Sequence, residues 1–212
     1  MPPASKSAKP TLNPEIALQR KHGGPVAGVD EAGRGPWAGP VVAAAVIFTG
    51  TPPKGIHDSK QLSEEAREAL FPEILAVAHA GIGIAEVETI DRLNIYHATH
   101  AAMCEAVTKL ACAPSAVLVD GNRLPKLSMP AEALIGGDAL SLSIAAASII
   151  AKVTRDRIMR ELALSFPAYG WERNKGYGTK EHAAALRRHG ATRHHRRSFR
   201  PVQEQLKLEA GG

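Results

Sequence analysis

Cysteine is scarce in this chain of 212 residues, which contains Cys104 and Cys112 and no others. The two do not form a Cys-x-x-Cys pair, and no convincing Cys/His zinc spacing surrounds them. The sequence therefore offers no support for a disulfide framework or a structural zinc site. Two thiols in a helix-like stretch are typical of packing residues, and they favour a reducing, cytoplasmic location.

Long hydrophobic runs are also missing. The longest are VVAAAVIF (41–48) and IAAASIIA (144–151), which are far shorter than a bilayer requires. The first ten residues, MPPASKSAKP, lack the apolar segment of a signal peptide. We expect a disordered tail over residues 1–18, a single domain over 19–212, and no membrane association. The hydrophobic content of 44% is enough for one core.

Acidic residues are absent between positions 181 and 204, although the chain as a whole carries a net charge of only +5. That stretch includes LRRHGATRHHRRSFR, and two explanations of it stay equally open. It is either a solvated basic surface or a surface that contacts phosphates. The second explanation assigns phosphate contacts to several side chains, with the histidines on the same surface: Arg193, Arg196, Arg197, His194 and His195.

Apolar periodicity predicts a mixed α/β sheet flanked by helices. The first two strands resemble a hairpin, and the later strands are expected to follow parallel crossovers. Strands are expected at 25–30, 41–48, 81–88, 116–120 and within 131–139. Helices are expected at 58–80, 89–111 and 143–166, from about 179, and near the C-terminus.

Three acids share one predicted setting. Asp30 and Asp120 each end a predicted strand, and Asp138 is expected to end the short strand before the long helix. Sites in α/β sheets form at the carboxyl ends of strands, so these acids converge if the first and fourth strands are neighbours. Glu31 can join Asp30 only if the strand ends or bulges there, because adjacent residues otherwise face opposite sides.

Oxygen ligands favour Mg²⁺ or Mn²⁺ over zinc, and two such ions can promote phosphodiester hydrolysis. Each acid alone is better explained as a cap, a turn or a solvated strand end, and only the joint pattern favours a metal site. A phosphate-binding loop at GVDEAGRG is the first alternative. It lacks both glycine-rich phosphate motifs, and its acids would repel phosphate. A non-catalytic nucleic-acid-binding module, the second alternative, does not account for the clustered acids.

Five segments closely resemble bacterial ribonuclease HII, the type 2 ribonuclease H. They are AGVDEAGRGPWAGPVVAAAVI (27–47), DSKQLS (58–63), VLVDGN (117–122), GGDALSLSIAAASIIAKVTRDRIM (136–159) and NKGYGTKEHAAALRRHG (174–190). The resemblance implies an RNase H-like fold with a C-terminal helical extension over about 165–212. It also implies cleavage of RNA in RNA–DNA hybrids and incision at single ribonucleotides in duplex DNA, leaving 5′-phosphate and 3′-hydroxyl ends.

The same resemblance implies a set of site residues. Its metal-binding acids, for Mn²⁺ or Mg²⁺, fall on Asp30, Glu31, Asp120 and Asp138. A Gly-Arg-Gly loop that reads the 2′-hydroxyl of the ribonucleotide falls on Gly33, Arg34 and Gly35. Glycine suits this task because it lets the backbone approach the sugar closely, and the 2′-hydroxyl is what distinguishes RNA from DNA. A tyrosine that stacks on the sugar falls on Tyr177.

Four further residues are predicted to contact phosphates or support the ligands: Ser59, Lys60, Ser148 and Lys152. An ion pair with Asp156, four residues on, explains Lys152 equally well. We expect a monomer whose partner is nucleic acid. The related ribonuclease HIII carries an extra N-terminal domain, for which the residues ahead of the first predicted strand are too few.

Overall fold

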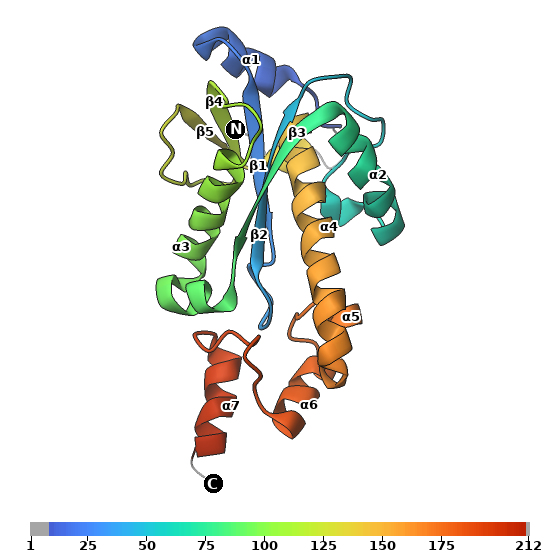
Figure 1. Ribbon diagram of the computed structural model, residues 1–212, viewed down its shortest axis with the longest axis vertical. Coiled ribbons are helices and arrows are strands. Elements are labelled where there is room, and N and C mark those ends of the chain that lie inside the picture. The colour runs from blue at the N-terminus through green and yellow to red at the C-terminus, as the bar shows by residue number, and fades with distance from the viewer. Residues whose placement is uncertain (1–8, 211–212) are drawn as a thin grey trace.

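The computed structural model describes residues 9–210 and contains a five-stranded sheet in the order β3-β2-β1-β4-β5 (Figure 1). Strand β1 is antiparallel to β2 and parallel to β4, while β3 extends the antiparallel side and β5 the parallel side. This confirms the predicted mixed sheet. The strand bounds are Val26–Ala32, Val41–Phe48, Ala78–Ala85, Ala116–Asp120 and Ala131–Leu134 for β1 to β5.

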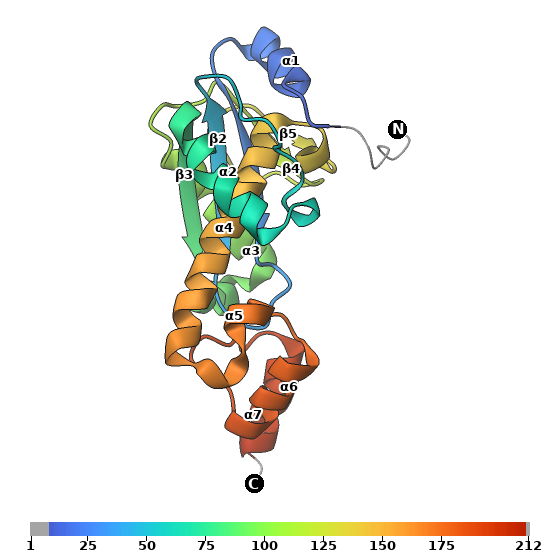
Figure 2. The same cartoon turned by 90° about the vertical axis from the view of Figure 1, so that its right-hand side faces the viewer.

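Helices cover both faces of the sheet. Helix α3 lies on one face, and α2 and α4 lie on the other (Figures 1 and 2). The short helices α5 to α7 form the predicted C-terminal extension, at the end of the molecule away from α1 (Figure 1). Helix bounds are α1 Asn13–His22, α2 Glu64–Val77, α3 Val87–Thr108, α4 Leu142–Ser165, α5 Trp171–Asn174, α6 Lys180–His189 and α7 Arg200–Ala210.

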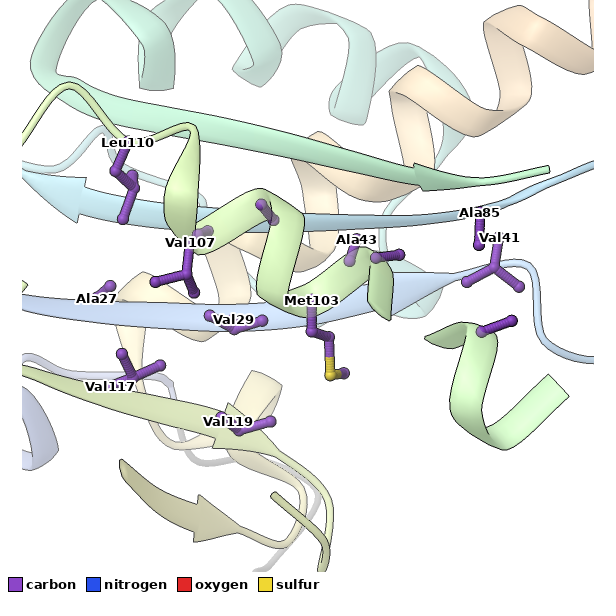
Figure 3. Close-up of a cluster of buried hydrophobic side chains, with 14 of the residues drawn as sticks. Ala27, Val29, Val41, Ala43, Ala85, Met103, Val107, Leu110, Val117 and Val119 are labelled. Atoms are coloured by element: carbon purple, nitrogen blue, oxygen red, sulfur yellow. The ribbon is translucent and has the colours of Figure 1, made fainter. Parts of the chain in front are cut away.

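Strand β2 is apolar throughout because both of its faces are buried. Val41 and Ala43 belong to the buried cluster between the sheet and α3, which also contains Met103 (Figure 3). Their neighbours Val42 and Ala44 pack against α4 on the other face. The alanines leave room for the helices to approach the sheet, and this two-sided packing fixes the strand whose partner, β1, carries the first acids.

The N-terminal prediction is wrong for residues 13–18, which lie in helix α1 rather than in a disordered tail. Residues 1–8 of the predicted tail lie outside the described residues. Leu18 is buried, and Glu15 Oε1 accepts hydrogen bonds of 2.6–2.8 Å from Ser141 and Ser143. A carboxylate there complements the N-terminus of α4. These contacts fasten α1 to the body of the protein.

Three details of the helices and strands also differ from the sequence prediction. Residues 78–80, expected to be helical, begin β3. Asn94, at φ 66°, interrupts α3, and its side chain accepts hydrogen bonds from the two backbone N–H groups of Tyr96 and His97. Asp138 does not end a strand, because β5 stops at Leu134 and Asp138 lies in a 3₁₀ turn over Gly137–Ala139.

Candidate active site

Two acids meet where the parallel pairing of β1 and β4 stops. Strand β1 itself continues to Ala32 in unbroken register with β2, so the predicted strand end or bulge at Asp30 is not found, although Glu31 still lines the same cleft. Val29 of β1 lies opposite Val119 of β4, so the next residues in register are Asp30 and Asp120. The 3₁₀ turn is bound to the same place, because the backbone N–H of Gly137 donates to Asp120 Oδ1 over 2.7 Å. Asp138, the following residue, is thereby held beside Asp120.

The three aspartates repel one another. Burial, and then the charges of Glu31, Asp120 and Asp138, holds the pKa of Asp30 well above its ordinary value of 3.8. The pKa of Asp120 is raised by burial and by Glu31, against hydrogen bonds that lower it. The pKa of Asp138 is raised by burial and by Asp120. Like charges held together at a partly buried site are a common mark of function.

Two basic side chains offset part of this charge. Arg34 Nη1 lies 3.3 Å from Glu31 Oε1, and Lys60 Nζ lies 3.5 Å from Asp138 Oδ2. Burial alone would lower the pKa of Lys60, but the carboxylates around it, Asp138 and Asp30 foremost, raise that pKa overall. The site therefore attracts positive charge even after its own cations are counted.

The donor set fits a hard divalent cation. The four acids Asp30, Glu31, Asp120 and Asp138 offer only carboxylate oxygens, which is the chemistry that Mg²⁺ and Mn²⁺ prefer. Residues 9–210 contain no group of three or more His, Cys, Asp or Glu side chains already in metal-holding geometry. The mutual repulsion that raises the pKa of Asp30 is what a bound cation would relieve.

A cleft of about 250 Å³ opens beside these acids. Every predicted site residue except Asp138 lines it, and Asp138 is joined to it through Lys60. The fold therefore brings predicted residues from five distant segments into one place. The lining residues are Asp30, Glu31, Ala32, Gly33, Arg34, Gly35, Ser59, Lys60, Asp120, Ser148, Lys152 and Tyr177.

The Gly33–Gly35 loop is held from behind by two buried arginines. Arg196 donates to the carbonyl oxygens of Gly33 (2.6 Å) and Arg34 (2.9 Å), and also to those of Pro36, Gly39 and Pro40. Arg155 donates to Pro40 O over 2.9 Å. Gly33 has φ 96°, and a Cβ there would lie 2.0 Å from Arg155 Nε. Glycine is required at this position by both backbone conformation and packing.

Tyr177 stands across the cleft from this loop and is 45% exposed. Its N–H donates to Asn174 O, and its own carbonyl accepts from the Thr179 N–H. A Cβ added to Gly35 would lie 3.6 Å from Tyr177 Cε1. The tyrosine ring and the loop therefore face each other across a gap that would just admit a methyl group, and both line the cleft.

The remaining predicted residues form pairs. Ser59 Oγ and Ser148 Oγ lie 2.6 Å apart and are both buried. Lys152 Nζ lies 2.7 Å from Asp156 Oδ1, so the ion pair that competes with a substrate role for Lys152 is formed. Burial lowers the pKa of Lys152, although Asp156 opposes the shift. Lys152 still lines the cleft while it makes this pair.

The basic stretch differs from its prediction at two positions. Arg196 and His195 have no exposed surface, so neither belongs to a basic surface. Burial lowers the pKa of Arg196 to about 9 and that of His195 to about 3. Arg193 and Arg197, in contrast, are exposed. In sequence, a run of arginine and histidine is typical of a basic surface. The burial of Arg196 could not be predicted because its carbonyl partners lie 156–163 residues away along the chain.

A second hollow, of about 280 Å³, is not predicted from the sequence and shares Glu31, Arg34 and Asp120 with the first. Tyr96, His100, Asn122 and Arg123 line its far side. Asn122 and Arg123 lie two and three residues after Asp120, so their place near the acids could be predicted from the sequence. Tyr96 and His100 come from the part of α3 after Asn94 and could not be placed from the sequence alone.

Comparison with known proteins gives a consistent result. The family model for ribonuclease HII matches residues 27–202. A ribonuclease HII of Jannaschia sp. is 53% identical over 197 residues, covering 92% of this chain and 99% of the relative. The crystal structure of ribonuclease H2 from Pyrococcus horikoshii superposes with a TM-score of 0.74 at 25% identity, covering 89% of this chain and all of that one.

A third similarity concerns the fold alone. The structure of Bst-RNase HIII in complex with Mn²⁺ has a TM-score of 0.67 at 20% identity, covering 94% of this chain and 75% of that one. Within residues 9–210, no helix is long and apolar enough to span a bilayer. The resemblance stated from the sequence is confirmed, as is the fold class.

Proposed function

The chain belongs to the ribonuclease HII family, whose members are endoribonucleases of RNA–DNA hybrids, and on that premise we propose how its site selects and cleaves nucleic acid. The site incises duplex DNA at a single embedded ribonucleotide as well as the RNA strand of continuous hybrids. The observation that carries the proposal is the cluster of mutually repelling carboxylates beside a loop and a tyrosine that face each other.

Asp30, Glu31, Asp120 and Asp138 would hold two divalent ions, Mg²⁺ or Mn²⁺. When bound, such ions neutralise charge on the scissile phosphate and make water more acidic. The chain itself places the carboxylates. Strand β1 carries Asp30 and Glu31, β4 carries Asp120, and the Gly137 N–H fixes the orientation of Asp120. The Mn²⁺ described for Bst-RNase HIII is compatible with this assignment.

Ribose recognition falls to the Gly33–Gly35 loop. Arg196 occupies the carbonyl oxygens of Gly33 and Arg34. Among the described residues, the backbone N–H groups of Arg34 and Gly35 make no hydrogen bond to protein. Donors of this kind at the cleft can bind a 2′-hydroxyl oxygen, which DNA lacks. Tyr177, half exposed and opposite the loop, would hold the sugar by stacking.

Substrate contact outside the cleft would use the exposed basic side chains near the C-terminus. We propose further that the protein acts as a monomer, with a mass of 22.4 kDa in solution, and that it works in the cytoplasm. Light scattering tests the first statement and cell fractionation the second. Hydrolysis would leave 5′-phosphate and 3′-hydroxyl ends, because the attacking water replaces the 3′-oxygen at phosphorus.

The test is a cleavage assay on three matched duplexes: all DNA, DNA with one ribonucleotide, and an RNA–DNA hybrid. We expect metal-dependent cleavage of the second and third and none of the first, with product ends identified by ligation and phosphatase treatment. Chelation and Asp30→Asn are the inactive controls. Cleavage of the hybrid alone would overturn single-ribonucleotide incision, and activity that persists after chelation would overturn the metal assignment.

A further inference from the structure

A buried chain of hydrogen bonds leads away from Tyr177. The Tyr177 carbonyl lies 3.0 Å from His182 Nδ1. His182 Nε2 lies 3.2 Å from Trp171 Nε1 and 3.0 Å from His195 Nε2. His195 Nδ1 lies 3.0 Å from the backbone N–H nitrogen of Thr192. Both imidazoles and the indole are fully buried.

The proton positions in this chain follow from which partners can only donate. The Thr192 backbone N–H donates, so His195 Nδ1 accepts and His195 carries its proton on Nε2. The Trp171 indole also only donates, so His182 Nε2 accepts from both Trp171 and His195. His182 therefore carries its proton on Nδ1 and donates it to Tyr177 O. Each contact determines the next.

The turn that carries Tyr177 has a strained backbone, which a hydrogen bond from outside the turn can restrain. Lys175 and Gly176 both have positive φ, 50° and 82°, which is costly for the lysine. The turn also touches the facing loop, because the Trp37 N–H donates to Gly176 O over 2.8 Å. A tyrosine 45% exposed on a short turn has little other packing to define its ring position. The Tyr177 carbonyl accepts from the Thr179 N–H within the turn, and the second contact, from His182, ties the backbone from which the ring projects to the buried histidine pair.

We propose that His182 is a positioning residue for ribose recognition, which it serves by holding Tyr177, and that His195 keeps His182 in the required orientation and tautomer. The inference rests on the proposed function of Tyr177. Misplacement of a contacting group by about 1 Å can cost on the order of 100-fold in rate. A substrate with a single ribose should be the most sensitive, since only one sugar is available to be held.

Two substitutions at His182 separate its contacts. His182→Asn retains an N–H near the Nδ1 position and so can still donate to Tyr177 O. His182→Gln places its amide near the Nε2 position and loses that donor. We expect His182→Gln to lower kcat/KM on the single-ribonucleotide duplex by about tenfold or more relative to the continuous hybrid. His182→Asn should stay within about threefold of wild type. His189→Gln, on the exposed side of the same helix, is the control.

A double-mutant cycle distinguishes positioning from general stability. In a Tyr177→Ala background, His182→Gln should change the ratio between the two substrates by less than about twofold, because the ring that His182 positions is gone. Independent, multiplying losses would overturn the proposal and assign His182 a purely structural role. If His182→Gln does not fold, the cycle is run with His195→Asn, which keeps an acceptor for Thr192 and loses the Nε2 donor.

Failure of the positioning role of His182 can be distinguished from failure of the proposed function. A wild-type protein that cleaves neither substrate would overturn the function itself. A wild-type protein that cleaves both, with Asp30→Asn inactive and the cycle additive, would overturn the positioning role alone.

Discussion

Lys60 Nζ lies 3.5 Å from Asp138 Oδ2, so a lysine from the DSK segment acts as an internal counter-charge for the carboxylate cluster. The lysine lowers the pKa of Asp138 and Asp120, against the larger effect of burial. Its side chain is 77% exposed, so the pair itself contributes little to stability. The main effect of Lys60 is therefore on the ionisation of Asp138 and Asp120.

Lys60→Met should therefore move the acid limb of the activity profile. Without the lysine, Asp138 and Asp120 hold their protons to higher pH, so kcat/KM should begin to fall at a higher pH than in the wild type. A profile of kcat/KM against pH at saturating metal measures this. Lys60→Arg, which keeps the charge, is the control. An acid limb that moves to lower pH, or does not move, would contradict the role of Lys60.

Asp30→Asn should abolish cleavage while stabilising the metal-free protein. The pKa of Asp30 is raised in the folded state, above its ordinary value of 3.8. The folded protein thus binds this proton more tightly than the unfolded chain does, and stability declines as pH rises from about 3.8 through the folded pKa. Asparagine removes that decline, so the gain in unfolding free energy should be present at pH 7 and absent at low pH.

Denaturant unfolding of Asp30→Asn and wild type at pH 7 and pH 3, with chelator, measures this difference. Activity should drop at least about 100-fold, the lower end for losing a group that stabilises transition-state charge. An Asp30→Asn protein that is less stable than wild type at pH 7 would mean that Asp30 supports the fold through its contacts. Wild-type activity would remove it from the catalytic machinery.

The exposed arginines near the C-terminus should contribute affinity rather than chemistry. Substituting Arg188, Arg193 and Arg197 by glutamine should weaken substrate binding and flatten its dependence on salt, because fewer counterions are released. Binding of an uncleaved duplex to the Asp30→Asn protein at several salt concentrations measures the slope. An unchanged slope would leave the stretch as a solvated surface.

Arg196 belongs to a different class, although it lies within the same stretch. It donates to five carbonyl oxygens of the Gly33–Pro40 loop and has no exposed surface. Arg196→Met should cost about 3–5 kcal/mol of stability, because buried carbonyls lose their partner. Thermal unfolding checks this. A stable Arg196→Met protein with only a flattened salt slope would restore Arg196 to the basic surface.

The sequence could predict the placement of Asp30 and Asp120 because apolar periodicity locates the end of a strand to within about two residues, as at Asp30, where β1 continues to Ala32. It could not predict the contacts of Glu15 or Arg196, whose partners lie more than a hundred residues away and have no pattern of their own. His195 was misplaced for a related reason. A histidine between basic residues resembles a surface, and only the packing of Trp171 and His182 around it makes it a buried one. Features set by neighbouring residues can thus be predicted from the sequence, whereas the burial of a polar side chain by distant segments cannot.

The facing pair Gly35 and Tyr177 gives the sharpest test of how ribose is selected. A Cβ at Gly35 would lie 3.6 Å from Tyr177 Cε1, an ordinary contact, so Gly35→Ala should fold normally. The added methyl instead fills the space through which a sugar would approach the loop. Activity on a single embedded ribonucleotide should fall sharply, since that substrate offers one 2′-hydroxyl. Activity on a continuous hybrid should fall less, since other phosphates can still be engaged. Tyr177→Ala should show the same bias, and Tyr177→Phe, which keeps the ring, should not.

Gly33→Ala is the matched control, because φ 96° and a 2.0 Å contact with Arg155 Nε predict lost stability instead of altered selectivity. Steady-state kinetics on both substrates, with thermal unfolding of each variant, measures all four. Equal losses on the two substrates for both Gly35→Ala and Tyr177→Ala would refute this assignment of ribose recognition.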